Sequence, residues 1–250
     1  MVNQFFFPKN TVDNLSEKDL HRQLDYREAI YALARTTYSS LYVINYATQA
    51  FEYVSENPLF LCGHTAQEVQ DMGYAFYYKY VTKEDLDLLT QINKIGFDFF
   101  DTIPISERRL YTISYDFHLQ SDVKKKILVN QKLTPMFLTD SGKIWKALCT
   151  VSLSTQRNSG NIQISKKGYN QIFKYDLEKN RWNTVEVIKL TEREKEVLQF
   201  SIRGFTINEI AQEIFVSPET IKFHRRKLFD KMGVTNMSEA IFYAANNKLL

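Results

Sequence analysis

Residues 190–250 repeat one pattern, a residue that begins a helix followed by a short amphipathic stretch. Thr191, Thr206 and Asn236 each stand three residues before a glutamate, a spacing that allows the reciprocal hydrogen bonds of a capping box. Ser217 is followed by Pro218, a capping residue and then a proline at the first helical position. These signals predict four helices, at about 192–203, 207–214, 218–232 and 237–247.

Glycines and apolar residues agree with these four helices. Gly204 and Gly233 fall where a left-handed residue commonly ends a helix. The second and fourth helices carry apolar residues at the i, i+3, i+4, i+7 spacing of one helix face. These residues are Ile207, Ile210, Ala211 and Ile214, and Met237, Ala240, Ile241 and Ala244. Each apolar face has to be buried, and four short helices can bury one another.

The third helix follows the second after a very short turn. Only Phe215 and Val216 separate the second helix from Ser217, and so tight a turn predicts the steep crossing of a helix-turn-helix unit. At about 100° per residue, the inward face of the third helix carries Ile221, Leu228 and Met232. The outward face of its N-terminal half carries Lys222, Phe223 and Arg226. This half of a recognition helix is the part that reaches base edges.

The chemistry of the outward residues separates base contacts from backbone contacts. Lys222 and Arg226 can donate to guanine O6 and N7, and Phe223 can lie against a thymine methyl. Lys227 lies on a flank suited to a phosphate. Arg225 lies closer to the apolar side, from where its long side chain can reach a phosphate or a neighbouring helix. A run of charge alone is more often a solvated face, but this run lies on the second helix of a tight pair, which favours nucleic-acid binding.

Many positions in this segment share the pattern of one family. They are Leu190-Thr191, Arg193-Glu194, Glu196-Val197-Leu198, Gly204, Asn208-Glu209-Ile210-Ala211, Ser217, Thr220-Ile221-Lys222, His224, Leu228, Lys231-Met232-Gly233-Val234, Asn236 and Ala240. Residues 190–245 thereby resemble the LuxR-type DNA-binding domain. The resemblance implies a four-helix domain whose third helix (218–232) reads the major groove, usually as a dimer on a two-fold related site.

The resemblance also implies particular contacts. Base contacts would fall on Lys222, Phe223 and Arg226. Phosphate contacts would fall on Asn208, on Thr220 and on residues near them. The full set of predicted phosphate contacts is Asn208, Ser217, Thr220, Arg225 and Lys227. Two positions depart from the family pattern, because Lys227 stands where Asn is common and adds positive charge, and the bulky Phe223 narrows the expected sequence preference.

The resemblance further suggests that the fourth helix pairs two copies of the chain. Phe242 and Tyr243 lie off the apolar stripe of that helix, so they are candidates for the dimer interface. The alternative is that both pack on the upstream domain, and the sequence does not choose between these arrangements.

The composition places the protein among globular chains with a local basic face. The chain carries 32 Lys and Arg against 29 Asp and Glu, a net charge of +3, so bulk electrostatics would not by itself indicate a nucleic-acid partner. Cys62 and Cys149 suit a reducing compartment and are expected to be thiols rather than a disulfide. The apolar run Phe5-Phe6-Phe7 is too short for a signal peptide or a membrane span, which predicts a cytoplasmic protein with no membrane partner.

Upstream of the four helices, the apolar period changes along the chain. The pattern predicts a helix at about 16–36, a strand pair at 41–45 and 51–54, and helices that begin after Thr65 and Thr82. Strict alternation over 111–119 predicts a half-buried strand. Strands at 127–138 and 144–153 follow, joined by the turn sequence Asp140-Ser141-Gly142. Pro135 inside the first of these strands predicts an edge position or a bulge.

This order of two strands, short helices and three longer antiparallel strands resembles a PAS domain over about residues 36–155. The resemblance also rests on Cys62-Gly63-His64-Thr65 leading to Glu68, and on Thr82-Lys83-Glu84-Asp85-Leu86. It implies a half-open sheet with helices across one face, in a module that senses ligands, cofactors or partner proteins.

The whole chain is therefore predicted to be α+β, with a PAS-like antiparallel sheet and flanking helices before an all-α helix-turn-helix domain. A hairpin at 162–164 and 169–175 is expected as an addition to the sheet. The expected divisions are a helical extension at 1–37, a PAS-like sensor domain with this hairpin at 38–176, a linker at 177–189, and the LuxR-type domain at 190–250.

The sequence contains no nucleophile–base grouping, phosphate loop or metal-ligand spacing, so neither an enzyme nor a cofactor site is expected. Aromatic residues crowd 74–80 and 97–100, where core packing is favoured over a ligand cage. His64 and His118 are only weak metal-ligand candidates. Whether the PAS-like domain binds a small molecule or a protein is left open.

The favoured interpretation is a one-component transcription regulator that binds double-stranded DNA as a homodimer, with RNA polymerase as a further candidate partner. Three alternatives stay open: a quorum-sensing member of the same family, a sigma factor, and a partner-binding protein that has lost DNA binding. Trp145 and Trp182 lie outside the place expected for the tryptophan of quorum-sensing members. The run Thr220-Ile221-Lys222-x-His224 favours the LuxR type over a sigma factor.

Overall fold

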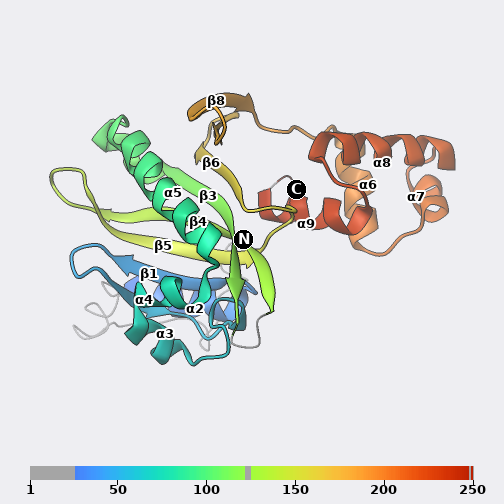
Figure 1. The fold of residues 1–250 in the computed structure, drawn as a ribbon. Helices are drawn as coiled ribbons and strands as arrows, with labels where there is room; N and C mark the ends of the chain where they lie inside the picture. The colour runs from blue at the N-terminus through green and yellow to red at the C-terminus, as the bar shows by residue number, and fades with distance from the viewer. Residues whose placement is uncertain (1–25, 122–124, 248, 250) are drawn as a thin grey trace, which may run out of the picture.

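The computed structural model of the chain describes residues 26–121, 125–247 and 249. Figure 1 shows an N-terminal domain built on one sheet and a C-terminal domain built from helices, which confirms the predicted α+β class. The helices of the N-terminal domain are α2 (Tyr26–Thr36), η2 (Pro58–Phe60), α3 (Ala66–Met72), α4 (Ala75–Tyr80), α5 (Lys83–Asp101) and η3 (Ile105–Leu110). The helices of the C-terminal domain are α6 (Glu192–Ile202), α7 (Ile207–Glu213), α8 (Pro218–Met232) and α9 (Met237–Asn247).

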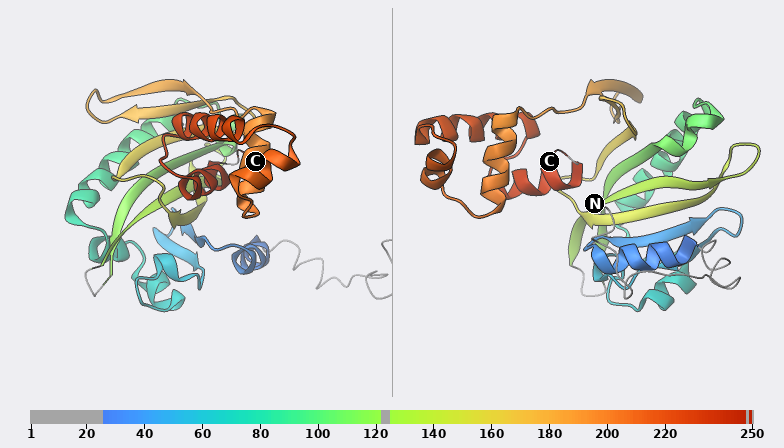
Figure 2. Two further views of the ribbon diagram at one scale, coloured as in Figure 1. Left: turned by 90° about the vertical axis from the view of Figure 1, so that its right-hand side faces the viewer. Right: turned by 180° about the vertical axis from the view of Figure 1, so that it is seen from behind.

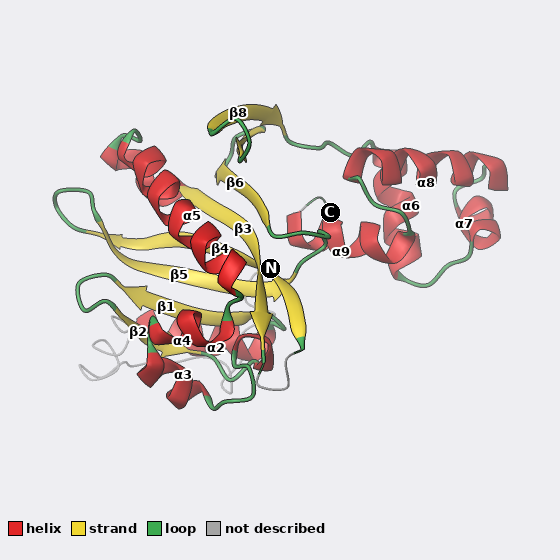
Figure 3. Cartoon of the chain, viewed as in Figure 1, coloured by secondary structure: helices red, strands yellow, loops and turns green. Residues whose placement is uncertain are grey.

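A single antiparallel sheet organises the N-terminal domain. Its strands are β1 (Ser40–Asn45), β2 (Ala50–Val54), β3 (Tyr111–Gln120), β4 (Lys126–Leu138), β5 (Ile144–Leu153), β6 (Gly160–Lys166), β7 (Gln171–Asp176) and β8 (Arg181–Glu186). Their order is β2-β1-β5-β4-β3-β6-β7-β8. Figures 2 and 3 show α5 lying across one face of the sheet and α2 on the opposite face, beside β1.

Each face of the sheet is covered by a separate apolar cluster. The larger cluster joins the sheet to α3, α4 and α5 and includes Phe60, Phe76, Phe117, Val129 and Val151, all 0% exposed. The smaller cluster holds α2 through Ile30 against Leu41, Val43 and Tyr53. None of the helices in the described part of the chain is long and apolar enough to cross a membrane.

Local sequence signals located most of these elements. The capping box of Thr65 begins α3 as predicted, and α5 begins after Thr82 as predicted and runs to Asp101. Residues 16–25 of the predicted first helix lie outside the described residues. Its described part, α2, buries Ile30, whereas Leu33 is 46% exposed.

Two details of the sheet differ from the prediction. β4 lies between β5 and β3, so Pro135 is not on an edge strand. Its pairing with β5 shifts register between Pro135 and Phe137, which confirms the predicted bulge. β3 is buried on both faces at its centre, where the polar residues Ser114 and Asp116 are 5% and 1% exposed. The side-chain amide of Asn130 donates to Asp116 at 2.9 Å and to Ser114 at 3.1 Å, so these buried polar groups have hydrogen-bond partners. The prediction of a half-buried strand was wrong there.

The segment expected as a linker contains a strand. Residues 181–186 form β8, which pairs with β7 along its whole length. The ring of Trp182 lies 5.1 Å from that of Phe99 and 5.0 Å from that of Tyr175, so the strand is anchored to the end of α5. The predicted linker 177–189 was therefore too long, and residues 187–191 connect the last strand to α6.

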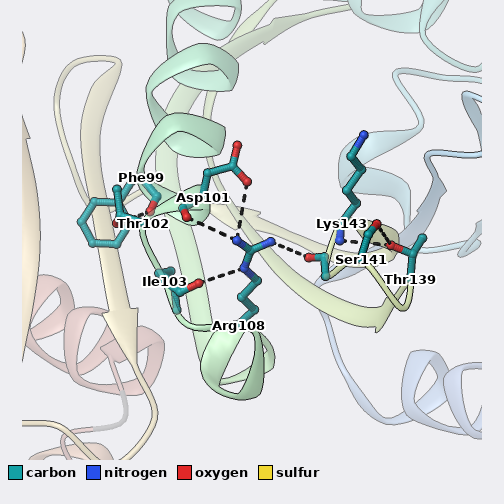
Figure 4. A network of polar contacts seen from close by, with 9 residues as sticks. Phe99, Asp101, Thr102, Ile103, Arg108, Thr139, Ser141 and Lys143 are labelled. Atoms are coloured by element: carbon teal, nitrogen blue, oxygen red, sulfur yellow. Dashed lines mark hydrogen bonds and ion pairs between the residues drawn. The ribbon is translucent and has the colours of Figure 1, made fainter.

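Arg108 ties the end of α5 to the turn between β4 and β5 (Figure 4). Its side chain is nearly buried, and its guanidinium donates to the carbonyls of Ile103 at 3.0 Å, Gly142 at 2.7 Å and Asp101 at 3.3 Å. The same group lies 4.9 Å from the ring centre of Phe100. One guanidinium thus donates hydrogen bonds to three carbonyls, two at the end of α5 and one in the turn between β4 and β5.

Replacing Arg108 by Lys is expected to lower the free energy of unfolding of the N-terminal domain by about 1–3 kcal/mol, because an ammonium cannot present a planar fork to three carbonyls. Arg109 is exposed, so Arg109→Lys is the matched control and should change that free energy by less than about 0.5 kcal/mol. Urea unfolding followed by circular dichroism measures both. Equal effects of the two changes would show that the buried fork has no special role.

Candidate nucleic-acid interface

The C-terminal domain buries one side of each of its helices in a common core. The fully buried residues of this core are Val197, Leu198, Ile210, Ile221, Leu228, Ala240 and Ala244. The three inward residues predicted for α8 are confirmed, since Ile221 and Leu228 are 0% exposed and Met232 is 5% exposed. Because these side chains are fixed in the core, α8 cannot rotate about its axis, and its opposite face has to meet solvent.

Side chains hold the start of each of these helices in place. Thr191 and Thr206 both form the reciprocal box with the glutamate three residues later, as predicted. The hydroxyl of Ser217 accepts from the backbone N–H three residues later at 3.1 Å. At α9 the box is incomplete, because the carboxylate of the expected glutamate accepts from Thr235 while Asn236 caps the helix. All four predicted helix starts are nevertheless present.

The outward face of α8 carries the three residues predicted to read bases. The side chain of Lys222 is 53% exposed, Phe223 is 51% exposed, and Arg226 is also exposed. Their exposure on one face is as predicted, and their contacts with bases remain a prediction.

In the absence of DNA, neighbouring side chains occupy part of this face. The ammonium of Lys222 lies 2.7 Å from a carboxylate oxygen of Glu219, and the ammonium of Lys227 lies 4.6 Å from the ring centre of Phe223. Exposed pairs of this kind contribute about 0–1 kcal/mol, so exchanging them for contacts with DNA costs little.

The residues predicted to contact phosphate differ in their exposure and in the contacts that they already make. Asn208 and Lys227 are exposed. The hydroxyls of Ser217 and Thr220 lie 2.8 Å apart, and that of Ser217 already caps α8. Arg225 is half-buried, with its guanidinium 6.0 Å from the ring centre of Phe229. Lys227 and Asn208 are thus the most open of this set.

One residue of the basic run does not face outward. The ammonium of Lys231 lies 2.6 Å from a carboxylate oxygen of Glu194, whose side chain is 1% exposed, and 3.3 Å from the carbonyl of Lys189. Of the five basic residues that the sequence counts between 222 and 231, Lys231 is thus held in this pair and Arg225 is half-buried. The exposed basic residues that remain for DNA are Lys222, Arg226 and Lys227. Sequence reasoning missed this pair because its members are 37 residues apart, beyond any helical spacing.

The pair fixes the ionisation of Glu194. Burial alone would raise the pKa of this carboxyl, but the hydrogen bonds from Lys231 and from the backbone of Thr191 outweigh it and hold the pKa below its usual value. A carboxyl with a lowered pKa in the folded state stabilises the fold above the pKa of the unfolded chain. This contribution is lost as the pH falls through the lower, folded-state pKa.

The two candidate dimer residues of α9 face the N-terminal domain in this structure. Phe242 borders a pocket of about 600 Å³ shared with Gln156 and Arg157, and Tyr243 borders one of about 440 Å³ shared with Asp116 and Leu177. In Figure 1, α9 is the helix of its domain nearest the sheet. Tyr243 also packs against the core of its own domain. Neither the dimer role of the two residues nor their packing on the upstream domain is thereby decided, and the dimer role stays a prediction.

A second candidate site lies between the sheet and the helices α4 and α5. A pocket of about 350 Å³ is bordered there by Tyr74, Tyr77, Tyr115 and Gln131. The amide nitrogen of Gln131 donates to the hydroxyl of Tyr115 at 2.6 Å. Its amide oxygen is the buried side-chain atom that finds no hydrogen-bond partner among the described residues. The aromatic cluster 74–80 thus has two roles, since Phe76 and Tyr80 pack in the core.

The described histidines and cysteines do not lie in a cluster that could hold a metal ion. His118 lies 2.8 Å from the carboxylate of Asp85, and His64 contacts the hydroxyl of Tyr80. No group of three or more His, Cys, Asp or Glu side chains among the described residues could hold a metal ion. Neither cysteine of the described chain is in a disulfide, as expected.

Replacing Lys231 by Met is expected to lower the free energy of unfolding of the C-terminal domain at pH 7 by about 1–3 kcal/mol, because Glu194 is left buried and charged. The difference from the wild type should narrow as the pH falls below the ordinary glutamate pKa of about 4.3. It should disappear only below the lowered pKa of the folded wild-type carboxyl, where both proteins carry Glu194 protonated.

The control for this change is Lys222→Met, which breaks an exposed pair of the same two residue types and should alter the free energy of unfolding by less than about 0.5 kcal/mol at either pH. Denaturant unfolding at pH 7 and pH 4 measures all three proteins. A constant difference across this range would show that Glu194 is not stabilised by Lys231.

Comparison with known proteins places the C-terminal domain. Residues 189–244 match the family model described as "Bacterial regulatory proteins, luxR family". The chain is 42% identical over 67 residues to the CsgBAC operon transcriptional regulatory protein of Escherichia coli K12, covering 27% of this chain and 31% of that protein. It is 36% identical over 69 residues to the oxygen regulatory protein NreC of Staphylococcus aureus, covering 27% and 32%. The chain thus spans about a third of the length of these relatives.

Among solved structures, similarity extends further along the chain at lower identity. A VqmA–ligand–DNA complex from Vibrio cholera aligns over 89% of this chain and 88% of that chain, with 15% identity and a TM-score of 0.30. The N-terminal domain of a diguanylate cyclase with PAS/PAC sensor from Marinobacter aquaeolei aligns over 46% and 94%, with 15% identity and a TM-score of 0.36. The family match and the buried and exposed faces of α8 agree: residues 189–244 are a helix-turn-helix domain of the bacterial luxR family of regulatory proteins.

Proposed function

We propose that this protein is a one-component regulator of transcription that binds specific sites in double-stranded DNA through α8. The observation that carries this proposal is the two-sided character of α8. Ile221, Leu228 and Met232 fix one side in the core, and Lys222, Phe223 and Arg226 stand exposed on the other. A rigid helix with donors on its open face is suited to the major groove, where each base pair presents a distinct set of acceptors and methyl groups.

The proposed contacts divide into two classes. Lys222 and Arg226 read guanine O6 and N7, and Phe223 packs against a thymine methyl. Lys227 and Asn208 bind phosphate and set the register of the helix without reading sequence. Further phosphate contacts are assigned to Ser217, Thr220 and Arg225.

We further propose that the protein acts as a homodimer. Two copies of α8 about 34 Å apart would enter successive major grooves on one side of the duplex. On the side of the N-terminal domain, Phe242 and Tyr243 border pockets of about 600 and 440 Å³ rather than a dense core. These side chains can therefore leave that domain at small cost and pair with a second copy.

A small molecule is the signal that the N-terminal domain fits best. The observation that favours it is the amide oxygen of Gln131, which is buried without a hydrogen-bond partner beside a pocket of about 350 Å³. Leaving a carbonyl oxygen in this state costs about 1–3 kcal/mol, and a ligand that donates a hydrogen bond would remove that cost. The pocket is bordered largely by tyrosines and apolar residues, with Lys83 and Asp87 as its charged groups.

Selection of bound fragments from random duplex DNA tests the DNA-binding proposal. It is expected to return a two-fold symmetric site with half-sites about one helical turn apart. Lys222→Ala or Arg226→Ala should lower affinity for that site by about 1–3 kcal/mol and relax the preference at one base pair of each half-site.

The matched control is Lys227→Ala. It should weaken binding to selected and random DNA alike, and reduce the slope of log affinity against log salt by about 0.9. If Lys222→Ala and Lys227→Ala behaved alike on both kinds of DNA, the division into base and phosphate contacts would be wrong.

Native mass spectrometry of the protein purified from its host tests the proposed signal. The wild type is expected to retain a small molecule, and the Gln131→Leu variant is expected to lose it. Without ligand, the free energy of unfolding of this variant should stay within about 1 kcal/mol of the wild type, because the change removes both an unsatisfied oxygen and one hydrogen bond. A wild-type protein that carries no molecule and shows no thermal shift with host extract would count against a small-molecule signal.

A further inference from the structure

The turn between α7 and α8 holds a phenylalanine in an unusual state. Phe215 has a backbone φ of 54°, in the left-handed region, and its side chain is 94% exposed. A bulky residue rarely adopts this region because its Cβ crowds the backbone. An exposed ring also leaves apolar surface in water. The fold therefore gains nothing visible from this side chain.

The hydrogen bonds around the turn show which residue type the backbone requires. The N–H of Val216 donates to the carbonyl of Ala211 at 3.0 Å, and that of Phe215 donates to Gln212 at 3.3 Å. These two bonds form a Schellman motif, in which the left-handed position is usually glycine. Phe215 occupies that glycine position.

Two other helices of the domain, α6 and α8, end in the same way and have the left-handed position among the described residues, so they provide an internal comparison. α6 ends at Gly204, with φ of 86° and a bond of 3.1 Å from Phe205 to Phe200. α8 ends at Gly233, with φ of 65° and a bond of 3.1 Å from Val234 to Phe229. The same chain thus uses glycine at two of these ends and a phenylalanine at the third. A strained residue that the fold does not need points to a role outside the fold.

The charges near Phe215 favour a protein over DNA as the partner of its ring. Glu213 and Glu219 are both exposed, two residues before and four residues after the phenylalanine. The basic residues of α8 begin only at Lys222. Exposed carboxylates on both sides of Phe215 in the sequence oppose phosphate and favour a basic surface. In the free protein Lys222 pairs with Glu219, so turning Lys222 toward a base leaves Glu219 free to attract such a surface.

The position of the turn leaves room for another protein to contact it while the chain is bound to DNA. α7 and the start of α8 form the end of the C-terminal domain that points away from the sheet, as Figures 1 and 2 show from both sides. A protein approaching there would not meet the N-terminal domain.

We propose that Phe215 is the anchor of a protein-docking surface, and that its partner is a component of the transcription machinery with an apolar pocket rimmed by basic residues. Aromatic residues, Phe included, are enriched in protein interfaces, and the rim of such an interface is polar. The inference rests on the proposed function, since the partner is met on the DNA site.

The test uses the full chain, purified RNA polymerase holoenzyme of the host, and a template carrying the selected site beside a promoter. Phe215→Gly suits the left-handed backbone, so this variant should melt at or above the wild-type temperature. Its dissociation constant for the site should stay within twofold of the wild type, while its effect on transcript level should fall at least fivefold. Phe215→Tyr keeps an aromatic ring and should retain most of the effect.

A second variant tests the charge of the rim. Glu213→Lys should reduce the effect on transcript level while affinity for DNA stays equal or rises, because a cation repels a basic partner and attracts phosphate. An undiminished effect on transcript level would contradict a basic partner surface.

Three outcomes overturn the inference. A parallel loss of site affinity and transcript effect in Phe215→Gly would mean that the ring contacts DNA, and no change in either would mean that it contacts nothing. A wild-type chain that binds the site but does not alter transcription would overturn the docking surface and leave DNA binding intact. A wild-type chain that binds no site would instead contradict the proposed function.

Discussion

The burial of Ile221, Leu228 and Met232 is the constraint on which the DNA-binding account depends. These side chains hold α8 in a core made by three other short helices, so the helix presents one fixed face to solvent. The ion pair between Lys231 and buried Glu194 adds a polar link between the end of α8 and the start of α6. If α8 could rotate, Lys222 and Arg226 would lose their defined direction, and a lysine-rich helix would bind phosphate without distinguishing bases.

An element could be predicted from the sequence when the residues that stabilise it lie close together in the chain. The C-terminal helices were located because caps and apolar stripes act within one or two turns, as at Thr191 and Ser217. The pair between Lys231 and Glu194, the strand β8 and the buried polar face of β3 depend on residues distant in the chain, and no local pattern encodes them. Phe215 was visible in the sequence as half of a short turn. Its left-handed backbone was not, because a phenylalanine gives no signal for that conformation.

In the N-terminal domain, α5 connects the pocket of about 350 Å³ with the strand that precedes the linker. Leu86, Leu89 and Asn93 of α5 border that pocket, and Phe99 lies near the other end of the same helix. The ring of Phe99 contacts that of Trp182 in β8, and β8 leads within five residues to α6. The second connection between the domains is made by α9, which borders residues 154–161 through pockets rather than dense packing. With a short covalent linker and only this loosely packed contact, the C-terminal domain could rotate about the linker.

The most direct measurement of the central claim replaces each guanine of the selected site by 7-deazaguanine, which removes the N7 acceptor and leaves phosphates and base pairing in place. The account predicts that one or two positions in each half-site lose about 1–3 kcal/mol of binding free energy, and that Lys222→Ala or Arg226→Ala removes the sensitivity at one of them. Uniform affinity across all substituted sites would contradict major-groove reading by α8.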